Sequence, residues 1–459
     1  MLGVLGQLER VERDAGLGAE RLDEGLRLET VRTGERPEEP EMDGRLAARP
    51  ALHPRDVGRL RARGAGERSR DEERRDDERG ACGGSRRHRS ERVGRAPAAA
   101  TRPLRCERRA RTMERTRIPK LPHPDEVMGV LARAASVLRP RARNTCDRLG
   151  VYEGLPLAKM FPAPRRVPDV ERRTRWRIRG IESEDLVFPS QHEPLEPAFA
   201  EYYRARRRRI HTVYARRIRP AACSERPRLL YIHGYMQPET LLEELALLAT
   251  MAGTLGMEVV QLQPPYHGRR RPRSSRLDGE LFWTADLVRS VESLRQTLLD
   301  ARTLLAWMRA ESPRQPVGIA GLSLGGALAA TLTCIEPGFA FSAPLIAHMD
   351  LGALVAHAPV LGAMRADLAR FGWTLRDFRR FTERIGWGEL RAVIPPERIH
   401  LFAAKDDRFF HPADVRAMWR RWERPKIRWY PGSHMGFLPH LPDAIARLGR
   451  FADALPAPA

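Results

Sequence analysis

Ser323 stands between glycines in the segment VGIAGLSLGG, residues 317–326. A serine hydroxyl attacks a carbonyl carbon only when a neighbouring base takes its proton. The apolar run before the serine predicts a strand and the run GALAATL after it predicts a helix, so the serine occupies a sharp turn between them. Such a turn needs small residues on both sides, which the segment supplies as Gly321, Gly325 and Gly326. The pattern predicts a nucleophilic serine, and an ordinary glycine-rich turn is the alternative.

The base for this serine is predicted at His434, in the segment WYPGSHMGFLPH. This histidine follows a predicted strand and precedes the last predicted helix, in a loop where an imidazole can reach a serine hydroxyl. Three other histidines are alternatives. His400 lies within a predicted strand, and His411 and His440 stand next to prolines in loops.

An acid must orient that imidazole and stabilise its charged form. Asp406 and Asp407, in the segment LFAAKDDRFFHP, follow a buried predicted strand. Adjacent residues leave a strand on different sides, so only one of the two carboxylates can face the imidazole. Asp407 is favoured because Phe410, three residues later, can anchor the loop. Asp406 is the alternative acid.

The oxyanion that forms during attack needs two preorganised hydrogen-bond donors. The segment YIHGYMQP ends an early predicted strand, and the backbone N–H of Tyr235 would face Ser323 there. Met236 is the alternative donor. The second donor is predicted at the Leu324 N–H, at the positive end of the helix that follows the serine. An ordinary turn at the end of the strand is the alternative for the first segment.

Predicted strands and helices alternate from Pro227 onward. The strand segments include RLLYIHG, MEVVQLQPP and ERIHLFAAKDD, and a long helix with an apolar stripe is predicted from about Ala285 to Arg309. This alternation is typical of an α/β fold with a predominantly parallel sheet flanked by helices. Active sites of such sheets gather at the carboxyl ends of the strands, where each of the polar clusters falls.

Three short segments before Pro227 predict strands at the edge of the sheet: RTRWRIRGIES, DLVFPS and RRIHTVYARRI. The basic run Arg204–Arg209 lies between them and is expected on a solvated hairpin. A short helix is expected at about 125–138, with Val127, Val130, Leu131, Ala134 and Leu138 on one side. We expect that side to pack against the main domain, and contact with a membrane surface is the alternative.

The first aromatic residue is Tyr152, and residues 1–112 are rich in charge, glycine and arginine. Such a segment cannot bury enough apolar surface to offset its chain entropy, so we expect a disordered N-terminal extension. Translation from Met113, where the composition changes, is a further hypothesis. Residues 113–175 are expected to form a helical, proline-rich lead-in. The main domain is expected at 176–459, with lid segments near 268–283 and 349–388.

The order Ser323, Asp407, His434 resembles the α/β-hydrolase superfamily, as do His233-Gly234 after an early strand and the phrase Gly-Leu-Ser-Leu-Gly-Gly. The segment PPYHGRRRP is also similar to one in esterase-like and peptidase-like members. The resemblance covers about 227–455 and implies a Ser-His-acid triad, a covalent acyl-enzyme and no cofactor. The acid loop departs from the pattern, since many members have Val-Pro where this chain has Phe410-His411.

The formal net charge is +22, and nearly all of the positive charge is arginine. A solvated arginine-rich surface is expected, and no nucleic-acid partner is expected, because the sequence carries no nucleic-acid-binding motif. The five cysteines lack any C-x-x-C pair, which argues against a disulfide framework and against a zinc site, and no metal is predicted. No apolar run is long enough for a transmembrane helix, so a cytoplasmic location is expected.

These residues together predict a serine hydrolase that cleaves a small-molecule acyl ester through a covalent acyl-enzyme. Amide or thioester cleavage, or acyl transfer to an alcohol, would use the same residues. A noncatalytic binding protein of this fold and a basic nucleic-acid-binding protein are the alternatives. At the mouth of the site, four arginines could favour an acidic or phosphate-bearing substrate, or could form a solvated cluster: Arg269, Arg270, Arg271 and Arg273.

Overall fold

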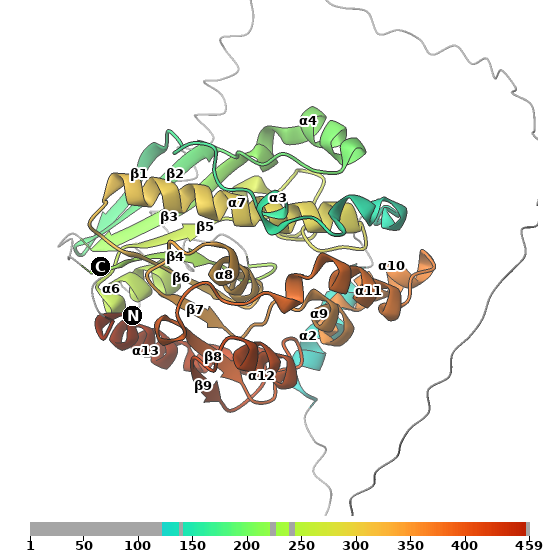
Figure 1. The fold of residues 1–459 in the computed structure, drawn as a ribbon. Coiled ribbons are helices and arrows are strands. Elements are labelled where there is room, and N and C mark those ends of the chain that lie inside the picture. The colour runs from blue at the N-terminus through green and yellow to red at the C-terminus, as the bar shows by residue number, and fades with distance from the viewer. Residues whose placement is uncertain (1–121, 137–140, 221–225, 238–243, 456–459) are drawn as a thin grey trace, which may run out of the picture. The chain divides into compact units, whose positions relative to one another are not determined.

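Within the residues that the structure describes, nine β-strands form one mixed sheet (Figure 1). The computed structural model describes residues 122–136, 141–220, 226–237 and 244–455. The strand order across the sheet is β1-β2-β3-β5-β4-β6-β7-β8-β9. The strands are β1 (Glu171–Ile178), β2 (Ile181–Pro189), β3 (Thr212–Pro220), β4 (Arg228–Ile232), β5 (Val259–Leu262), β6 (Val317–Leu322), β7 (Ser342–Leu345), β8 (His400–Ala404) and β9 (Lys426–Tyr430).

The sheet is parallel from β5 through β9 and antiparallel at the β1 edge. Strands β5, β4, β6, β7, β8 and β9 pair in parallel, whereas β1, β2, β3 and β5 pair antiparallel. Strands β4 and β6 are buried along their whole length, as central strands covered on both faces must be. The predicted fold class is confirmed. The carboxyl ends of β4, β6, β8 and β9 therefore lie at the same edge of the sheet.

Helices cover both faces of this sheet (Figure 1). Successive residues of β4 alternate between two apolar cores. Leu230 and Ile232 join α7 and α8 in one core, and Leu229 and Tyr231 join α6 and α13 in the other. The helices are α2 (Pro124–Ser136), α3 (Leu157–Met160), α4 (Pro197–His211), α6 (Thr250–Leu255), α7 (Leu287–Glu311), α8 (Leu324–Ile335), α9 (Leu351–His357), α10 (Gly362–Arg370), α11 (Leu375–Ile385), α12 (Pro412–Arg421) and α13 (Leu441–Asp453).

Shorter helical turns join these elements, and most of them are 3₁₀ turns. They are η1 (Cys146–Tyr152), η2 (Glu244–Ala249, a π-helical turn), η3 (Gly268–Arg270), η4 (Pro359–Leu361), η5 (Trp387–Glu389), η6 (Pro396–Arg398) and η7 (Met435–His440).

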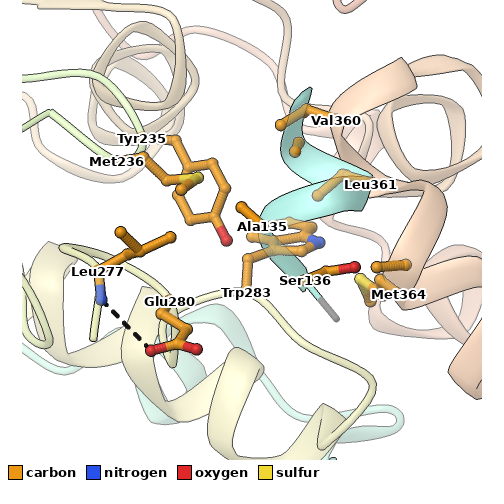
Figure 2. A pocket seen from close by; sticks show the side chains of 12 residues that line it. Ala135, Ser136, Tyr235, Met236, Leu277, Glu280, Trp283, Val360, Leu361 and Met364 are labelled. Atoms are coloured by element: carbon orange, nitrogen blue, oxygen red, sulfur yellow. Dashed lines mark hydrogen bonds between the residues drawn. The ribbon is translucent and has the colours of Figure 1, made fainter. Parts of the chain in front are cut away.

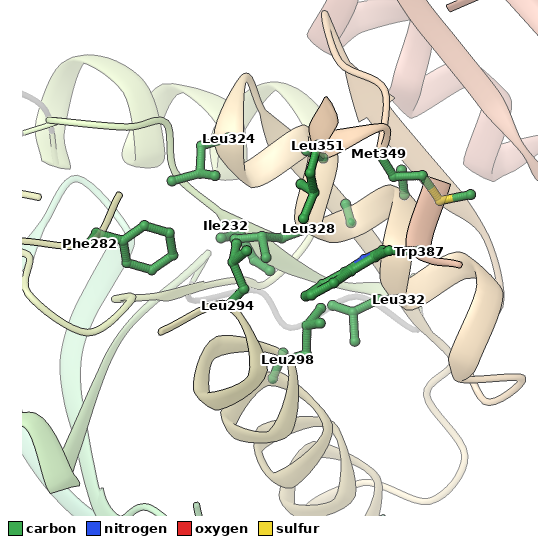
Figure 3. Close-up of a cluster of buried hydrophobic side chains, with 14 of the residues drawn as sticks. Ile232, Phe282, Leu294, Leu298, Leu324, Leu328, Leu332, Met349, Leu351 and Trp387 are labelled. Carbon is green, nitrogen blue, oxygen red and sulfur yellow. The ribbon is translucent and has the colours of Figure 1, made fainter. Parts of the chain in front are cut away.

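The core beneath the serine turn is formed by leucines of α7 and α8 (Figure 3). Leu294 and Leu298 are four residues apart on α7, and Leu328 and Leu332 are four apart on α8, so each pair lies on one helix face. The indole N–H of Trp387 donates to the Thr331 hydroxyl at 3.0 Å. This packing fixes α8, whose first turn follows Ser323.

The basic run Arg204–Arg209 lies in α4, and the prediction of a hairpin there is wrong. The helix begins with Pro197 at its first turn, and the Glu196 carboxylate caps it by accepting from the Ala198 and Phe199 amides. Tyr203 and Ile210, seven residues apart, are buried on the same helix face. The helical period of these apolar residues outweighs the partial alternation that suggested a strand.

Helix α2 packs through a different face from the predicted one. Val127, Val130 and Leu131 are exposed, at 40, 67 and 56 %. The buried residues are Asp125 and Gly129. The prediction that the apolar stripe packs against the domain is therefore wrong, and contact of this stripe with a membrane surface stays a prediction.

Several arginines lie inside the protein instead of on a solvated surface. The consecutive residues Arg216 and Arg217 of β3 are 6 and 4 % exposed and point to opposite faces of the sheet. Arg216 pairs with Asp185 at 2.8 Å, and Arg217 pairs with Glu258 at 2.9 Å. The expectation of a solvated arginine surface is wrong for these residues, because buried acidic partners compensate their charge.

The predictions for residues 1–112 lie outside the described residues. Strand β1 begins at Glu171, ahead of the predicted domain boundary at 176. Within the described ranges, no helix has the length and apolar character needed to cross a membrane.

Candidate active site

Ser323 occupies a tight turn between β6, which ends at Leu322, and α8, which begins at Leu324. Its backbone φ of 58° and ψ of −117° are unusual for a residue with a side chain. A Cβ atom at Gly321 would lie 2.2 Å from the Gly325 carbonyl oxygen, and one at Gly325 would lie 1.9 Å from the Ile232 carbonyl oxygen. Only glycine permits this close approach of α8 to β4 and β6. The half-buried serine hydroxyl is therefore held at the carboxyl edge of the sheet.

A hydrogen-bonded chain connects Ser323, His434 and Asp407. The His434 Nε2 atom lies 2.9 Å from the Ser323 Oγ atom, and the His434 Nδ1 atom lies 2.8 Å from the Asp407 Oδ2 atom. Because a carboxylate only accepts, the Nδ1–H donates to Asp407 and Nε2 is left to accept from the serine hydroxyl. His434 and Asp407 are 6 and 2 % exposed. The arrangement has the geometry of a nucleophile, a base and an acid that orients the base.

The Asp407 carboxylate is fixed by its own loop. The Asp407 Oδ1 atom accepts from the backbone N–H groups of Phe409 at 2.7 Å and Phe410 at 2.8 Å, which leaves Oδ2 for His434. The same two phenylalanine rings stack on the His434 ring, with centroids 4.4 and 5.6 Å away. The loop thus orients both the acid and the imidazole. Asp406, by contrast, is exposed, and only its backbone contacts the histidine loop, donating to the Gly432 carbonyl at 3.0 Å.

The three alternative histidines lie elsewhere. His400 is buried in β8 against Phe402, and its burial, together with Lys426 and Arg447, lowers its pKa to about 4. His411 caps α12, where its Nδ1 accepts from the Ala413 amide at 3.4 Å. The His440 ring lies 5.0 Å from the Tyr430 ring. Each of these rings is committed to local packing or capping.

The segment that follows β4 runs beside the serine. A Cβ atom at Gly234 would lie 3.6 Å from the Ser323 Cβ, and Met236 has a φ of 57°. The Leu324 N–H belongs to the first turn of α8, where no helix carbonyl can accept from it. Tyr235 and Leu324 as oxyanion donors stay a prediction.

The His267 ring packs against the segment that follows β4. Its ring lies 5.1 Å from the His233 ring and 6.3 Å from the Tyr235 ring, and its Nδ1–H donates to the Pro265 carbonyl at 3.0 Å. Burial and the neighbouring His233 lower the pKa of His267 well below its ordinary value, so the ring stays neutral. The histidine of the PPYHGRRRP segment is therefore a packing residue.

A pocket opens beside this segment, with Tyr235 projecting into it (Figure 2). Both predicted lid segments contribute to its wall, although their action as lids stays a prediction. Its lining is mainly apolar and comprises Ala132, Ala135, Ser136, Tyr235, Met236, Leu277, Glu280, Trp283, Val360, Leu361, Ala363 and Met364.

The contribution of α2 to this pocket escaped the sequence reasoning. Gly129, Ala132 and Ser136 are small residues spaced three and four apart, on the side of the helix away from the exposed apolar stripe. Small residues at that spacing indicate close approach to a neighbouring backbone. This was the signal in the sequence that could have located the packed face.

Two of the four arginines that follow β5, Arg269 and Arg270, form ion pairs within the fold. Arg270 is fully buried, pairs with Asp300 at 2.9 Å and donates to the carbonyls of Gln263 and Ile210. Arg269 pairs with Asp185 at 2.9 Å. The expectation of a solvated cluster or of an anionic substrate is therefore wrong for Arg270, whereas for Arg269, whose side chain is 34 % exposed, it stays a prediction. As for metals, the described residues contain no group of three or more ligating side chains that could hold an ion.

Comparison with known proteins gives matches to a family and to individual chains. The sequence pattern of the family "Alpha/beta hydrolase domain containing 18" matches residues 169–357, which include Ser323 but neither Asp407 nor His434. Two uncharacterized proteins of Mycobacterium tuberculosis, from strains H37Rv and CDC 1551, are each 30 % identical over 233 residues. That match covers 47 % of this chain and 52 % of each relative, so the chain spans about half the length of these relatives.

Among solved structures, the acetyl xylan esterase of Paenibacillus sp. R4 is 15 % identical with a TM-score of 0.44, and the match covers 69 % of this chain and 98 % of that one. Acetyl xylan esterase 1 of Thermoanaerobacterium sp. JW/SL YS485 is 16 % identical with a TM-score of 0.43, covering 67 % and 95 %. Likeness at this level carries no inference about activity. By its sheet topology, its strand-turn-helix at Ser323 and its family match, the chain belongs to the α/β-hydrolase superfamily.

Proposed function

We propose that the protein is a serine hydrolase that cleaves acyl esters through a covalent acyl-enzyme. The observation that carries this proposal is the hydrogen-bonded chain from Ser323 Oγ to His434 Nε2 at 2.9 Å and from His434 Nδ1 to Asp407 Oδ2 at 2.8 Å. A nucleophile, a base and an orienting acid in contact are the groups that acyl transfer requires. Ser323 is the nucleophile, His434 the general base and Asp407 the orienting acid.

In the first half of the reaction, His434 Nε2 takes the proton of the Ser323 hydroxyl while Oγ attacks the carbonyl carbon. The negative charge that develops on the carbonyl oxygen is met by the backbone N–H groups of Leu324 and Tyr235. As the ester C–O bond breaks, the imidazolium gives its proton to the departing alcohol. Asp407 stabilises that imidazolium and keeps the Nδ1–H in place.

In the second half, His434 takes a proton from a water molecule, whose oxygen attacks the acyl carbon. The bond to Ser323 Oγ breaks, the serine regains its proton from the imidazolium, and the carboxylic acid leaves. An amide, a thioester or an acceptor alcohol in place of water would use the same groups.

The pocket beside Tyr235 supports a small-molecule substrate with an apolar acyl part. Its wall is mainly aliphatic and aromatic, as the walls of small-molecule sites are. The Glu280 carboxylate on its rim accepts from the Ser275 hydroxyl and from the Arg276 amide, so it is committed to its own turn. An uncharged acyl group therefore fits this wall better than a cation.

The test combines a fluorophosphonate probe with a panel of p-nitrophenyl esters of increasing chain length. We expect the probe to label the wild-type protein, and Ser323→Ala to lose labelling and at least about 10³-fold in kcat/KM. Ser293→Ala is the matched control, because this buried α7 serine donates only to the Arg289 carbonyl within its helix. A folded wild-type protein without labelling would favour a noncatalytic binding protein, and turnover that survives in Ser323→Ala would overturn the mechanism.

A further inference from the structure

Asp125, in the first turn of α2, has a fully buried carboxylate. Its Oδ2 atom accepts from the backbone N–H of Arg408 at 3.0 Å and from that of His434 at 3.0 Å. Its Oδ1 atom accepts from the backbone N–H of Met435 at 2.9 Å. One carboxylate thus holds three backbone amides, none of them from its own helix.

The three amides belong to the two loops that carry the acid and the base. Arg408 directly follows Asp407 in the loop after β8, and His434 and Met435 lie in the loop after β9. Asp125 is the point at which both loops are bound to the same side chain. A shift of either backbone would change the distance between the Asp407 carboxylate and the His434 ring.

The three backbone amides also explain how the Asp125 carboxylate can be buried. Within the described residues, no arginine or lysine pairs with Asp125; the His123 Nδ1 atom lies 3.9 Å from Oδ2 and itself accepts from the Asp125 backbone N–H at 3.4 Å. A buried carboxylate without a close cation needs strong hydrogen bonds to replace its water. The neighbouring Glu126 contacts the same acid loop differently, through an exposed ion pair with the Arg408 side chain.

The close packing of α2 against η4 holds the Asp125 carboxylate in place. A Cβ atom at Gly129 would lie 2.5 Å from the Pro359 Cβ, so α2 approaches η4 as closely as only glycine allows. Further along the same helix, Ala132, Ala135 and Ser136 line the pocket. One helix therefore forms part of the pocket wall and fastens the loops of the acid and the base.

We propose that Asp125 is a positioning residue that aligns Asp407 with His434, and that α2 couples the pocket wall to this alignment. The proposal rests on the function proposed above as far as catalysis is concerned. The alignment itself is a property of the folded protein and can be measured without turnover.

The experiment uses the full chain and four variants, one of which, His434→Gln, serves only to assign an NMR signal. Asp125→Asn keeps the size of the side chain but places an NH₂ group against one of the three donating amides. We expect kcat for p-nitrophenyl acetate to fall about 10- to 100-fold while KM stays within about twofold, because a small displacement of the base affects the chemical step more than binding. The matched control is Glu126→Gln, which removes the exposed ion pair and leaves the amide contacts, with an expected change of less than about twofold.

Gly129→Ala displaces α2 while leaving Asp125 unchanged. It is expected to lower kcat like Asp125→Asn and also to raise KM, because α2 lines the pocket. This variant keeps the test decisive if Asp125→Asn does not fold.

A second readout reports alignment independently of activity. The proton between His434 Nδ1 and Asp407 gives a far-downfield proton NMR signal, assigned by its loss in His434→Gln. We expect that signal to be broadened or lost in Asp125→Asn and Gly129→Ala and kept in Glu126→Gln. If the wild type neither turns over esters nor labels but the signal follows this pattern, the proposed function fails and the positioning role stands. If Asp125→Asn lowers only the melting temperature, with kcat and the signal unchanged, the positioning role is overturned.

Discussion

Replacing Asp407 with asparagine tests how the acid loop sets the tautomer of His434. The Oδ1 atom of Asp407 accepts from two backbone amides, those of Phe409 and Phe410. In Asp407→Asn the amide oxygen keeps these two bonds, so the NH₂ group turns toward His434 Nδ1. The ring must then carry its proton on Nε2, which points that proton at Ser323 and removes the base.

The size of the effect follows from these contacts. If the side-chain amide of Asp407→Asn rotated by 180°, its oxygen would again accept from His434 Nδ1–H and Nε2 could act as the base. That rotation would break the two hydrogen bonds from the Phe409 and Phe410 amides, at about 1 kcal/mol each. About 2 kcal/mol leaves roughly one molecule in thirty with the active tautomer. The lost charge-assisted bond to the imidazolium costs a further 2 to 3 kcal/mol, roughly. Together these are about 4 to 5 kcal/mol, or a fall in kcat/KM of about 10³- to 10⁴-fold.

The assay is ester hydrolysis by Asp407→Asn and by Asp406→Asn, with folding checked by thermal melting. Asp406→Asn is the matched control, because that side chain is exposed and should change kcat/KM by less than about twofold. If Asp407→Asn kept more than about a tenth of the wild-type value, the tautomer argument would be refuted. If the large loss appeared in Asp406→Asn instead, the choice of acid would be wrong.

Two further predictions concern stability. Burial lowers the pKa of His400 to about 4, so between that value and the ordinary value near 6.5 the unfolded chain binds the extra proton and stability falls as the pH falls. His400→Phe, which keeps the stack on Phe402, should flatten the melting temperature between pH 7.5 and pH 5, and a decline as steep as that of the wild type would contradict this. Arg270→Met leaves the buried Asp300 without its ion-pair partner and should lower the free energy of unfolding in urea by about 3 to 5 kcal/mol. Arg269→Met, at a 34 % exposed side chain, should cost less than about 1 kcal/mol, and equal losses in the two variants would argue against this reasoning.

The sheet and the turn at Ser323 could be predicted because their signals are local. A buried parallel strand is a continuous apolar run, and a strained turn between strand and helix demands glycines where Gly321 and Gly325 stand. The order of strands then places residues that follow β6, β8 and β9 at one edge. The sequence can therefore indicate that Ser323, Asp407 and His434 lie together, and their catalytic roles stay a prediction.

The features that escaped prediction depend on tertiary contacts. Arg216 and Arg270 are typical surface residues by type, and only the fold brings them to Asp185 and Asp300. Asp125 likewise resembles any acidic residue in the first turn of a helix, where it would favour the helix dipole. Its three amide partners lie about 300 residues further along the chain, at separations of 283, 309 and 310 residues. No local pattern can reveal such contacts.

The long separation between Asp125 and Arg408 also orders events during synthesis of the chain. At about 5 to 20 residues per second, the ribosome makes Arg408 roughly 15 to 60 s after Asp125, and His434 later still. The Asp125 carboxylate of α2 therefore cannot form these hydrogen bonds until nearly the whole domain has been synthesised. A chain that ends before the histidine loop lacks two of these amide partners and the proposed base. On the mechanism proposed above, reactivity of Ser323 is expected only once translation has passed the histidine loop.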